Sequence, residues 1–70
     1  MANPKNEFLW LDGIRYWLYS RPKTLAGAVG VEKKLLERGL KMGRDFRIHF
    51  PKEQENYFKV FVREGMVPAA

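Results

Sequence analysis

Cysteine is absent from this chain of 70 residues, and histidine occurs once, at His49. Without thiols the protein forms no disulfide, no thiolate metal site and no cysteine nucleophile, and one imidazole cannot supply the ligands of a structural zinc site. Serine and threonine are limited to Ser20 and Thr24, so no set of nucleophile, base and orienting group can be assembled. The sequence therefore predicts a protein that is not an enzyme and needs neither a metal nor a cofactor.

Long apolar runs are also lacking. No stretch approaches the roughly 20 apolar residues that span a bilayer, and the first residues contain no apolar signal segment. These features predict a soluble, cytoplasmic protein with no membrane partner. The length fits a single domain, residues 1–70, with a small core. Residues 1–5 and 65–70 offer little to bury, and we expect them to be flexible ends.

Positive charge is unevenly distributed along the chain. The net charge is +5, and residues 21–44 alone hold seven cations and two anions, whereas the rest of the chain holds six of each sign. A localised excess of this kind is typical of proteins that bind a polyanion. The alternative is that these cations only keep a small domain in solution.

Residues 6–20 show two competing patterns. Apolar residues at 10, 11, 14, 17 and 18 recur at steps of three and four, which is typical of one face of a helix. Asp12-Gly13 between two apolar segments is a strong signal for a two-residue hairpin. We predict a helix because that pattern is longer and more regular. If the segment is a hairpin instead, the order becomes strand, strand, helix, strand, strand.

The middle of the chain predicts two helices. Thr24 can cap a short helix that runs to about Val29, and Gly30 permits a tight turn. A second helix from Val31 to about Met42 would end at Gly43, and four of its apolar residues fall on an inward face: Val31, Leu35, Leu36 and Leu40.

The pattern then changes to a period of two. Residues 46–50 and 57–63 alternate apolar and polar side chains and predict two half-buried strands. The polar segment 51–56 between them predicts a local hairpin. The predicted fold class is therefore α+β, with about three helices in a helix-turn-helix core followed by a β-hairpin wing.

The stretch from Leu25 to Leu40 resembles the winged helix-turn-helix family of DNA-binding domains. The resemblance is carried by Leu25-Ala26, Val29-Gly30-Val31 and Leu36, although Gly39 stands where the family usually has an apolar residue. In size and motif the chain is similar to the small regulators that phages and mobile elements encode. The resemblance implies a transcription regulator whose partner is double-stranded DNA, and dimerisation would let it read two half-sites.

The resemblance also implies roles for individual residues. The second helix would lie in the major groove, with Arg38 contacting guanine; the full recognition set is Lys33, Lys34, Glu37, Arg38 and Lys41. A second set would bind phosphates: Lys23, Thr24 and Arg44.

The predicted hairpin offers a further surface, formed by Arg47, His49, Lys59, Phe61 and Arg63. Cations around an aromatic ring suit an acidic protein surface or a nucleic-acid backbone, unless Phe61 belongs to the core. This surface supports a rival function: a small phage-type inhibitor or adaptor that binds a host protein machine such as RNA polymerase through basic and aromatic side chains. A weaker rival is sequence-independent binding of RNA or single-stranded DNA.

Overall fold

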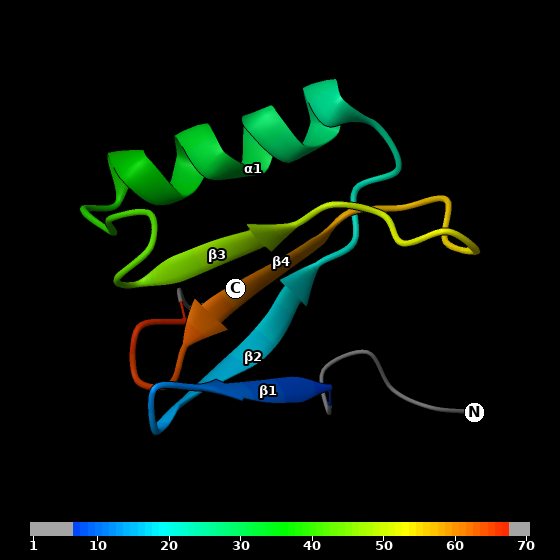
Figure 1. Cartoon of the computed structure of the whole chain (residues 1–70). Helices are drawn as coiled ribbons and strands as arrows, with labels where there is room; N and C mark the ends of the chain where they lie inside the picture. The colour runs from blue at the N-terminus through cyan, green and yellow to red at the C-terminus, as the bar shows by residue number, and fades with distance from the viewer. Residues whose placement is uncertain (1–6, 68–70) are drawn as a thin grey trace.

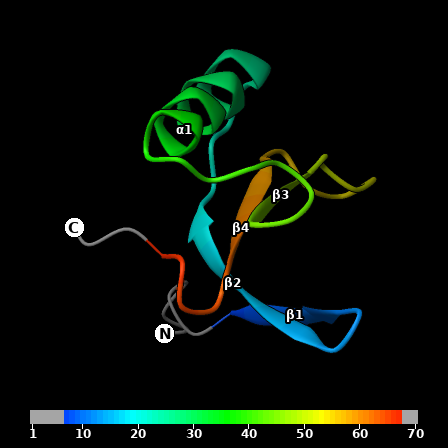
Figure 2. The ribbon, with the colours of Figure 1, turned by 90° about the vertical axis from the view of Figure 1, so that its left-hand side faces the viewer.

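The computed structural model describes residues 7–67, which form one helix and four strands (Figure 1). Along the chain these are β1 (Phe8–Leu11), β2 (Ile14–Ser20), α1 (Leu25–Glu37), β3 (Phe46–His49) and β4 (Lys59–Arg63). The strands form one antiparallel sheet in the order β1-β2-β4-β3. Figure 2 shows that the sheet curls into a half-barrel, with α1 on the side away from the β1–β2 hairpin. The predicted flexible ends fall largely outside the described residues.

Residues 8–20 form a hairpin, so the prediction of a helix here is wrong and the alternative is confirmed. Asp12 and Gly13 have φ angles of +53° and +78°, and a type I′ turn needs two such positive values. The misleading spacing arose because both faces of this hairpin are apolar. Leu9 and Tyr16 face each other on one side, and Phe8 and Trp17 face each other on the other. Two apolar faces together imitate a helical repeat.

Residues 25–37 form one continuous helix, which overturns the predicted pair of helices. Thr24 is the N-cap as expected, because its side-chain oxygen accepts a hydrogen bond of 3.0 Å from the backbone N–H of Gly27. Gly30, however, lies inside α1 and has no positive φ. A glycine in a helix costs about 1 kcal/mol relative to alanine but does not by itself end the helix. Residues 7–67 therefore contain no helix-turn-helix unit, and the resemblance to winged helix proteins is wrong.

The end of α1 also lies earlier than predicted. Gly39, with a φ of +89°, follows the cap residue Arg38. The N–H of Gly39 donates to the carbonyl of Leu36, and the N–H of Leu40 donates to that of Leu35. This is the Schellman arrangement, in which a glycine in the left-handed conformation closes a helix. Gly39 therefore ends the helix, and neither Met42 nor Gly43 does.

The two strands predicted near the C-terminus are confirmed as β3 and β4. They pair antiparallel, with Arg47 opposite Phe61 and His49 opposite Lys59. β4 also pairs with β2, with an irregularity between Leu18 and Ser20. Because β4 is an interior strand of the sheet, the β3–β4 pair is not a projecting wing, and the predicted fold class of three helices and a wing is replaced by a curled four-stranded sheet with one helix.

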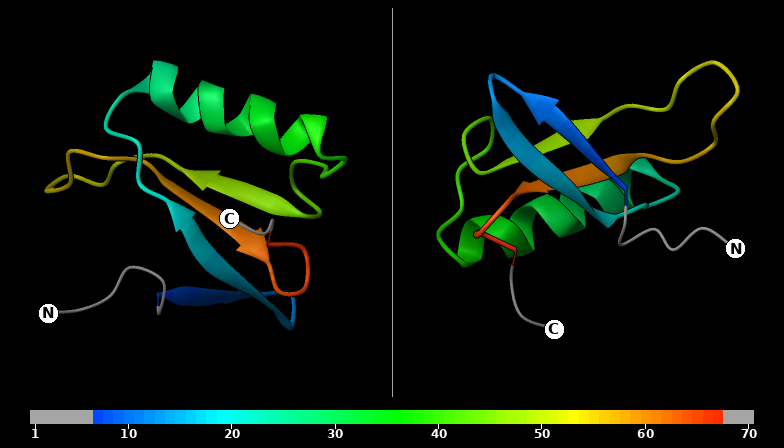
Figure 3. Two further views of the ribbon diagram at one scale, coloured as in Figure 1. Left: turned by 180° about the vertical axis from the view of Figure 1, so that it is seen from behind. Right: turned by 90° about the horizontal axis from the view of Figure 1, so that it is seen from below.

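Two apolar clusters lie on opposite faces of the sheet. The first lies under α1 and contains Leu35, Leu40, Phe46, Val60 and Val62. The second fills the concave face, which is visible from below in Figure 3, and contains Tyr16, Leu18 and Phe61. β4 joins the clusters because its alternate side chains enter each one. On the face that carries α1, the helix covers β3 and β4 but leaves the β1–β2 half of the sheet exposed.

Candidate binding surfaces

The predicted recognition residues do not lie on a groove-reading helix. Lys33, Lys34 and Glu37 lie in the last turns of α1, Arg38 caps it, and Lys41 follows in the loop; all five are exposed. None of the four cations takes part in an ion pair among the described residues. They form a solvent-facing cationic surface at the C-terminal end of α1.

The predicted phosphate-binding residues are not brought together. Lys23 and Thr24 lie at the start of α1, and Arg44 lies in the loop that follows it. A helix of 13 residues is roughly 20 Å long, which separates the two groups. Arg44 is also engaged elsewhere, because its guanidinium donates two hydrogen bonds of 3.0 and 3.1 Å to Asp45.

Asp45 is a buried residue that the sequence analysis missed. Its carboxylate is almost fully enclosed, and besides Arg44 it accepts a hydrogen bond of 2.9 Å from the N–H of Lys41. The Arg44 hydrogen bond, followed by that from Lys41, lowers the pKa of Asp45. The side chain therefore fastens the loop between α1 and β3. A carboxylate two residues after a glycine is only a weak indication of a buried, hydrogen-bonded loop residue, and no other sequence feature marked Asp45.

The predicted hairpin-face residues do share one face of the sheet. Register places Arg47, His49, Lys59, Phe61 and Arg63 together on the concave side. Phe61 is buried in the second cluster, so it belongs to the core and is not an exposed ring. The guanidinium of Arg47 lies 5.6 Å from the ring centre of Tyr16, and its Nε is buried without a hydrogen-bond partner among the described residues.

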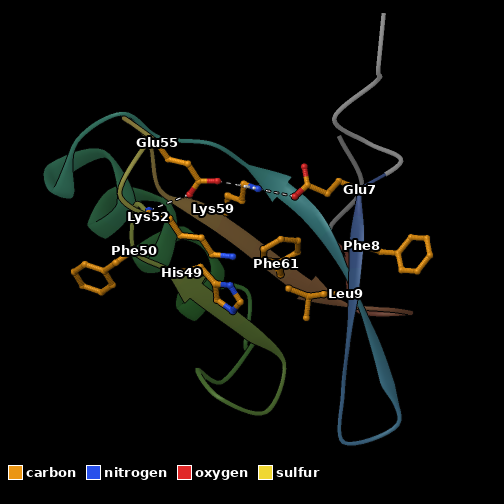
Figure 4. Close-up of a pocket in the computed structure, with 9 residues that line it drawn as sticks. All are labelled: Glu7, Phe8, Leu9, His49, Phe50, Lys52, Glu55, Lys59 and Phe61. Carbon is orange, nitrogen blue, oxygen red and sulfur yellow. Dashed lines mark hydrogen bonds and ion pairs between the residues drawn. The ribbon is translucent and has the colours of Figure 1, made fainter.

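A cavity of about 180 Å³ lies at one end of this concave face (Figure 4). Lys59 crosses it and binds Glu7 at 2.8 Å and Glu55 at 3.5 Å. The hydrogen bond to Glu7 raises the pKa of Lys59. Burial, followed by nearby cations, lowers the pKa of His49, so this environment disfavours the charged imidazolium. Lys59 is thus neutralised by two carboxylates, whereas the ammonium of Lys52, which also lines the cavity, takes part in no ion pair among the described residues.

The β1–β2 hairpin carries an exposed aromatic surface on the opposite side of the sheet. We call it the aromatic–arginine patch and define it as Phe8, Trp10, Arg15, Trp17 and Glu64. Phe8 is 43% exposed and Trp10 60% exposed. The ring of Phe8 lies 6.4 Å from that of Trp10 and 5.1 Å from that of Trp17. Three aromatic rings therefore form one continuous surface on a strand pair.

Arg15 lies at the centre of the aromatic–arginine patch. Its guanidinium carbon is 4.7 Å from the Trp17 ring centre and 5.3 and 5.5 Å from those of Phe8 and Trp10. Glu64 holds this guanidinium in an ion pair and also accepts a hydrogen bond of 3.2 Å from the indole N–H of Trp17. These contacts lower the pKa of Glu64, with Arg15 the main cause. The sequence analysis missed the patch because it read this segment as a helix.

An apolar groove of about 290 Å³ lies between α1 and β3, and we call it the α1–β3 groove. It is lined by Leu25, Ala28, Val29, Glu32, Met42, Ile48 and Phe50. Four of these apolar side chains are about half exposed or more: Leu25, Val29, Met42 and Phe50. The groove runs beside a strand at the edge of the sheet.

No protein-family model, curated protein or solved structure matches this chain. Within residues 7–67, no three histidine or carboxylate side chains are grouped to hold a metal ion. The one helix of that region is too short and too polar to cross a membrane.

Proposed function

We propose that the protein is a non-enzymatic adaptor or inhibitor that binds a partner protein through the aromatic–arginine patch. The observation that carries this proposal is the exposure of Phe8 and Trp10 around the centrally held Arg15. Tryptophan, tyrosine and arginine are the residues that most often dominate the binding energy of protein interfaces. Exposed apolar patches on small proteins commonly mark such interfaces.

The patch is already ordered without a partner. Arg15 is fixed by the ion pair to Glu64 and by the three rings that surround it. Each flexible side chain that must be immobilised costs about 0.5–1.5 kcal/mol on association. A surface whose side chains are fixed beforehand avoids part of that cost, so this patch suits tight binding over a small area.

Local charge favours a protein over a nucleic acid at this patch. The charge of Arg15 is balanced by Glu64, and the turn beside it carries the exposed carboxylate of Asp12. Single-stranded nucleic acids are bound where aromatic rings lie beside free cations that contact phosphates. The net charge of +5 acts over a longer range and favours partners with acidic surfaces.

The test compares the protein with two variants as bait in a lysate of the cells that encode it. Trp10→Ala removes the most exposed ring of the patch. Leu36→Ala removes a side chain on α1 that is 48% exposed and lies outside the patch. We expect a stoichiometric protein partner that the wild type and Leu36→Ala retain, and whose Kd rises at least tenfold with Trp10→Ala, as for an interface hot spot. Capture that is insensitive to Trp10→Ala, or no captured protein, would refute the proposal.

A second candidate function is duplex DNA binding by the cationic surface of α1. It is favoured by the four cations Lys33, Lys34, Arg38 and Lys41, which no described carboxylate pairs. Such contacts would fall on phosphates, and affinity would decline steeply with salt. The double substitution Arg38→Ala and Lys41→Ala should then reduce the salt slope by about two. No binding at low salt would exclude this candidate.

A further inference from the structure

The curled sheet brings its two outer strands to one cavity. β1 and β3 lie at opposite edges of the sheet, yet residues 7–9 at β1 and residues 49–52 at the end of β3 both contribute to the concave-face cavity of about 180 Å³ (Figure 4). Lys59 and Phe61 of β4 line it as well. Small ligands commonly bind in the mouths of β-barrels, and this cavity occupies the open side of a half-barrel.

One part of the cavity wall is apolar. Figure 4 shows Leu9 and Phe61 directed into the cavity, whereas the rings of Phe8 and Phe50 point away from it. The imidazole of His49 packs against the ring of Phe61, with 5.1 Å between the ring centres. A cavity of roughly 150 Å³ is large enough to hold benzene. The space beside Leu9, His49 and Phe61 therefore fits one aryl group.

The charges of the cavity are arranged unevenly. Glu7 and Glu55 both bind Lys59, and Glu55 also accepts a hydrogen bond of 3.0 Å from the backbone N–H of Lys52. The ammonium of Lys52 forms no ion pair among the described residues, and its side chain extends toward His49 in Figure 4. The two carboxylates are therefore grouped around Lys59, and the end of the cavity at Lys52 and His49 is left without one.

The charges that act on His49 are all positive. After burial, the causes that lower its pKa are the charges of Lys52, Arg47 and Lys59, and no carboxylate is among them. The imidazole also makes no hydrogen bond with a described residue. A negative group beside His49 would therefore meet a positive potential and a ring nitrogen that is available as a donor.

We propose that this cavity binds a small aryl carboxylate, with the carboxylate between Lys52 and His49 and the ring against the apolar wall. Lys52 supplies the opposite charge, and the imidazole donates an N–H. The side chains that line the cavity carry two cations and two carboxylates in all, so a single negative charge fits better than the double charge of phosphate. The site lies on the face of β1 opposite the aromatic–arginine patch, and the proposal does not depend on the function proposed for that patch.

Proton NMR of His49 tests the site, because the chain has no other histidine and the imidazole C–H resonances therefore report on this cavity alone. The probe is benzoate, titrated at constant ionic strength against chloride. We expect shifts of the His49 resonances that saturate in the millimolar range, as befits a ligand of few atoms. Bound benzoate should also raise the pKa of His49, because a nearby anion stabilises the imidazolium. Benzamide has the same shape without the charge and should bind about fivefold more weakly or worse.

Two variants separate this site from general attraction to a basic protein. Lys52→Met keeps the aliphatic chain of an exposed residue but removes its charge, and it should weaken benzoate binding about fivefold or more. Lys34→Met removes the same charge from α1, outside the cavity, and should leave the affinity for benzoate unchanged. The proposal would be overturned by the absence of a saturable shift at His49, by equal affinities of Lys52→Met and the wild type, or by binding of benzamide or inorganic phosphate that is as tight as that of benzoate.

Discussion

Gly30 is the residue at which the predicted helix-turn-helix unit and the observed continuous helix differ most clearly. As the turn of a helix-turn-helix unit it would need a conformation that other residues resist, whereas in the structure it is an ordinary helical residue. Apart from its chain neighbours and the backbone of its own helix, a Cβ atom added there would meet no atom within 4 Å. Sequence alone could not distinguish these cases, because glycine tolerates both.

The substitution Gly30→Ala should therefore stabilise the protein. We expect the free energy of unfolding to rise by about 0.5–1 kcal/mol, the usual difference between the two residues inside a helix. Gly39→Ala is the matched control: its φ of +89° strains any residue with a Cβ, so that variant should lose about 1–2 kcal/mol. Urea denaturation measures both. Destabilisation by Gly30→Ala would argue for a turn at that position.

The burial of Asp45 predicts how stability responds to acid. Because hydrogen bonds from Arg44 and Lys41 lower its pKa, the folded protein binds a proton at Asp45 less readily than the unfolded chain does. The stability that Asp45 provides is then present above the ordinary aspartate pKa of about 3.9 and is lost as the pH falls through the lowered folded-state value.

Urea midpoints between pH 7 and pH 3 should reveal this contribution of Asp45. Asp45→Asn should be less stable than the wild type at pH 7 and should show a shallower loss below about pH 4. A residual acid slope remains, because the pKa values of Glu55 and Glu64 are also lowered. Parallel curves for the two proteins would contradict the assigned role of Asp45.

At the scale of the element, α1 presents a narrower apolar face than its sequence predicts. The sequence places both Leu35 and Leu36 inward, but Leu35 is fully buried in the cluster under α1, whereas Leu36 is 48% exposed. Only Ala28 and Leu35 are buried among the residues of the helix. A single helix that covers half a sheet needs one narrow row of apolar side chains facing the sheet. The predicted helix in a bundle needed a wider apolar face, because it would have packed against more than one neighbour.

Alanine substitution of the two leucines should separate these arrangements. Leu35→Ala leaves a cavity in the core and should cost about 2–5 kcal/mol, a large fraction of the stability of a domain this small. Leu36→Ala should change stability by about 0.5 kcal/mol or less. Denaturant unfolding followed by tryptophan fluorescence measures both variants. Equal losses of stability in the two variants would instead indicate that α1 buries both leucines.

The strands β3 and β4 and the helix cap were predictable from sequence, and Asp12-Gly13 signalled the N-terminal hairpin as an alternative, whereas the surface of that hairpin was not predicted. Period-two alternation identified β3 and β4, and a hydroxyl before an apolar run identified Thr24 as a cap. The hairpin was misassigned because Phe8, Trp10 and Trp17 occupy the face that would normally be polar. Those residues form the proposed binding surface, so the local departure from the strand pattern coincides with the candidate site.

At the scale of the whole molecule, charge and aromatic surface are separated. The net charge of +5 resides in residues 21–44, around α1, whereas the aromatic–arginine patch lies on the β1–β2 hairpin with its own cation paired. The unpaired cations that would contact a polyanion therefore belong to a surface other than the aromatic–arginine patch. This separation supports two distinct uses of the two surfaces.

Both tryptophans of the chain, Trp10 and Trp17, belong to the aromatic–arginine patch, so selectively excited tryptophan fluorescence reports on the patch. We expect a dye-labelled oligothymidine to bind weakly at low salt, as its own anisotropy would show, while the tryptophan emission stays unchanged. The reason is that phosphates are drawn to the unpaired cations of α1, whereas Glu64 and Asp12 leave the patch without free positive charge. Stacking of a base on an indole would quench that emission. Quenching that Trp10→Phe abolishes would therefore reassign the patch from a protein partner to single-stranded nucleic acid.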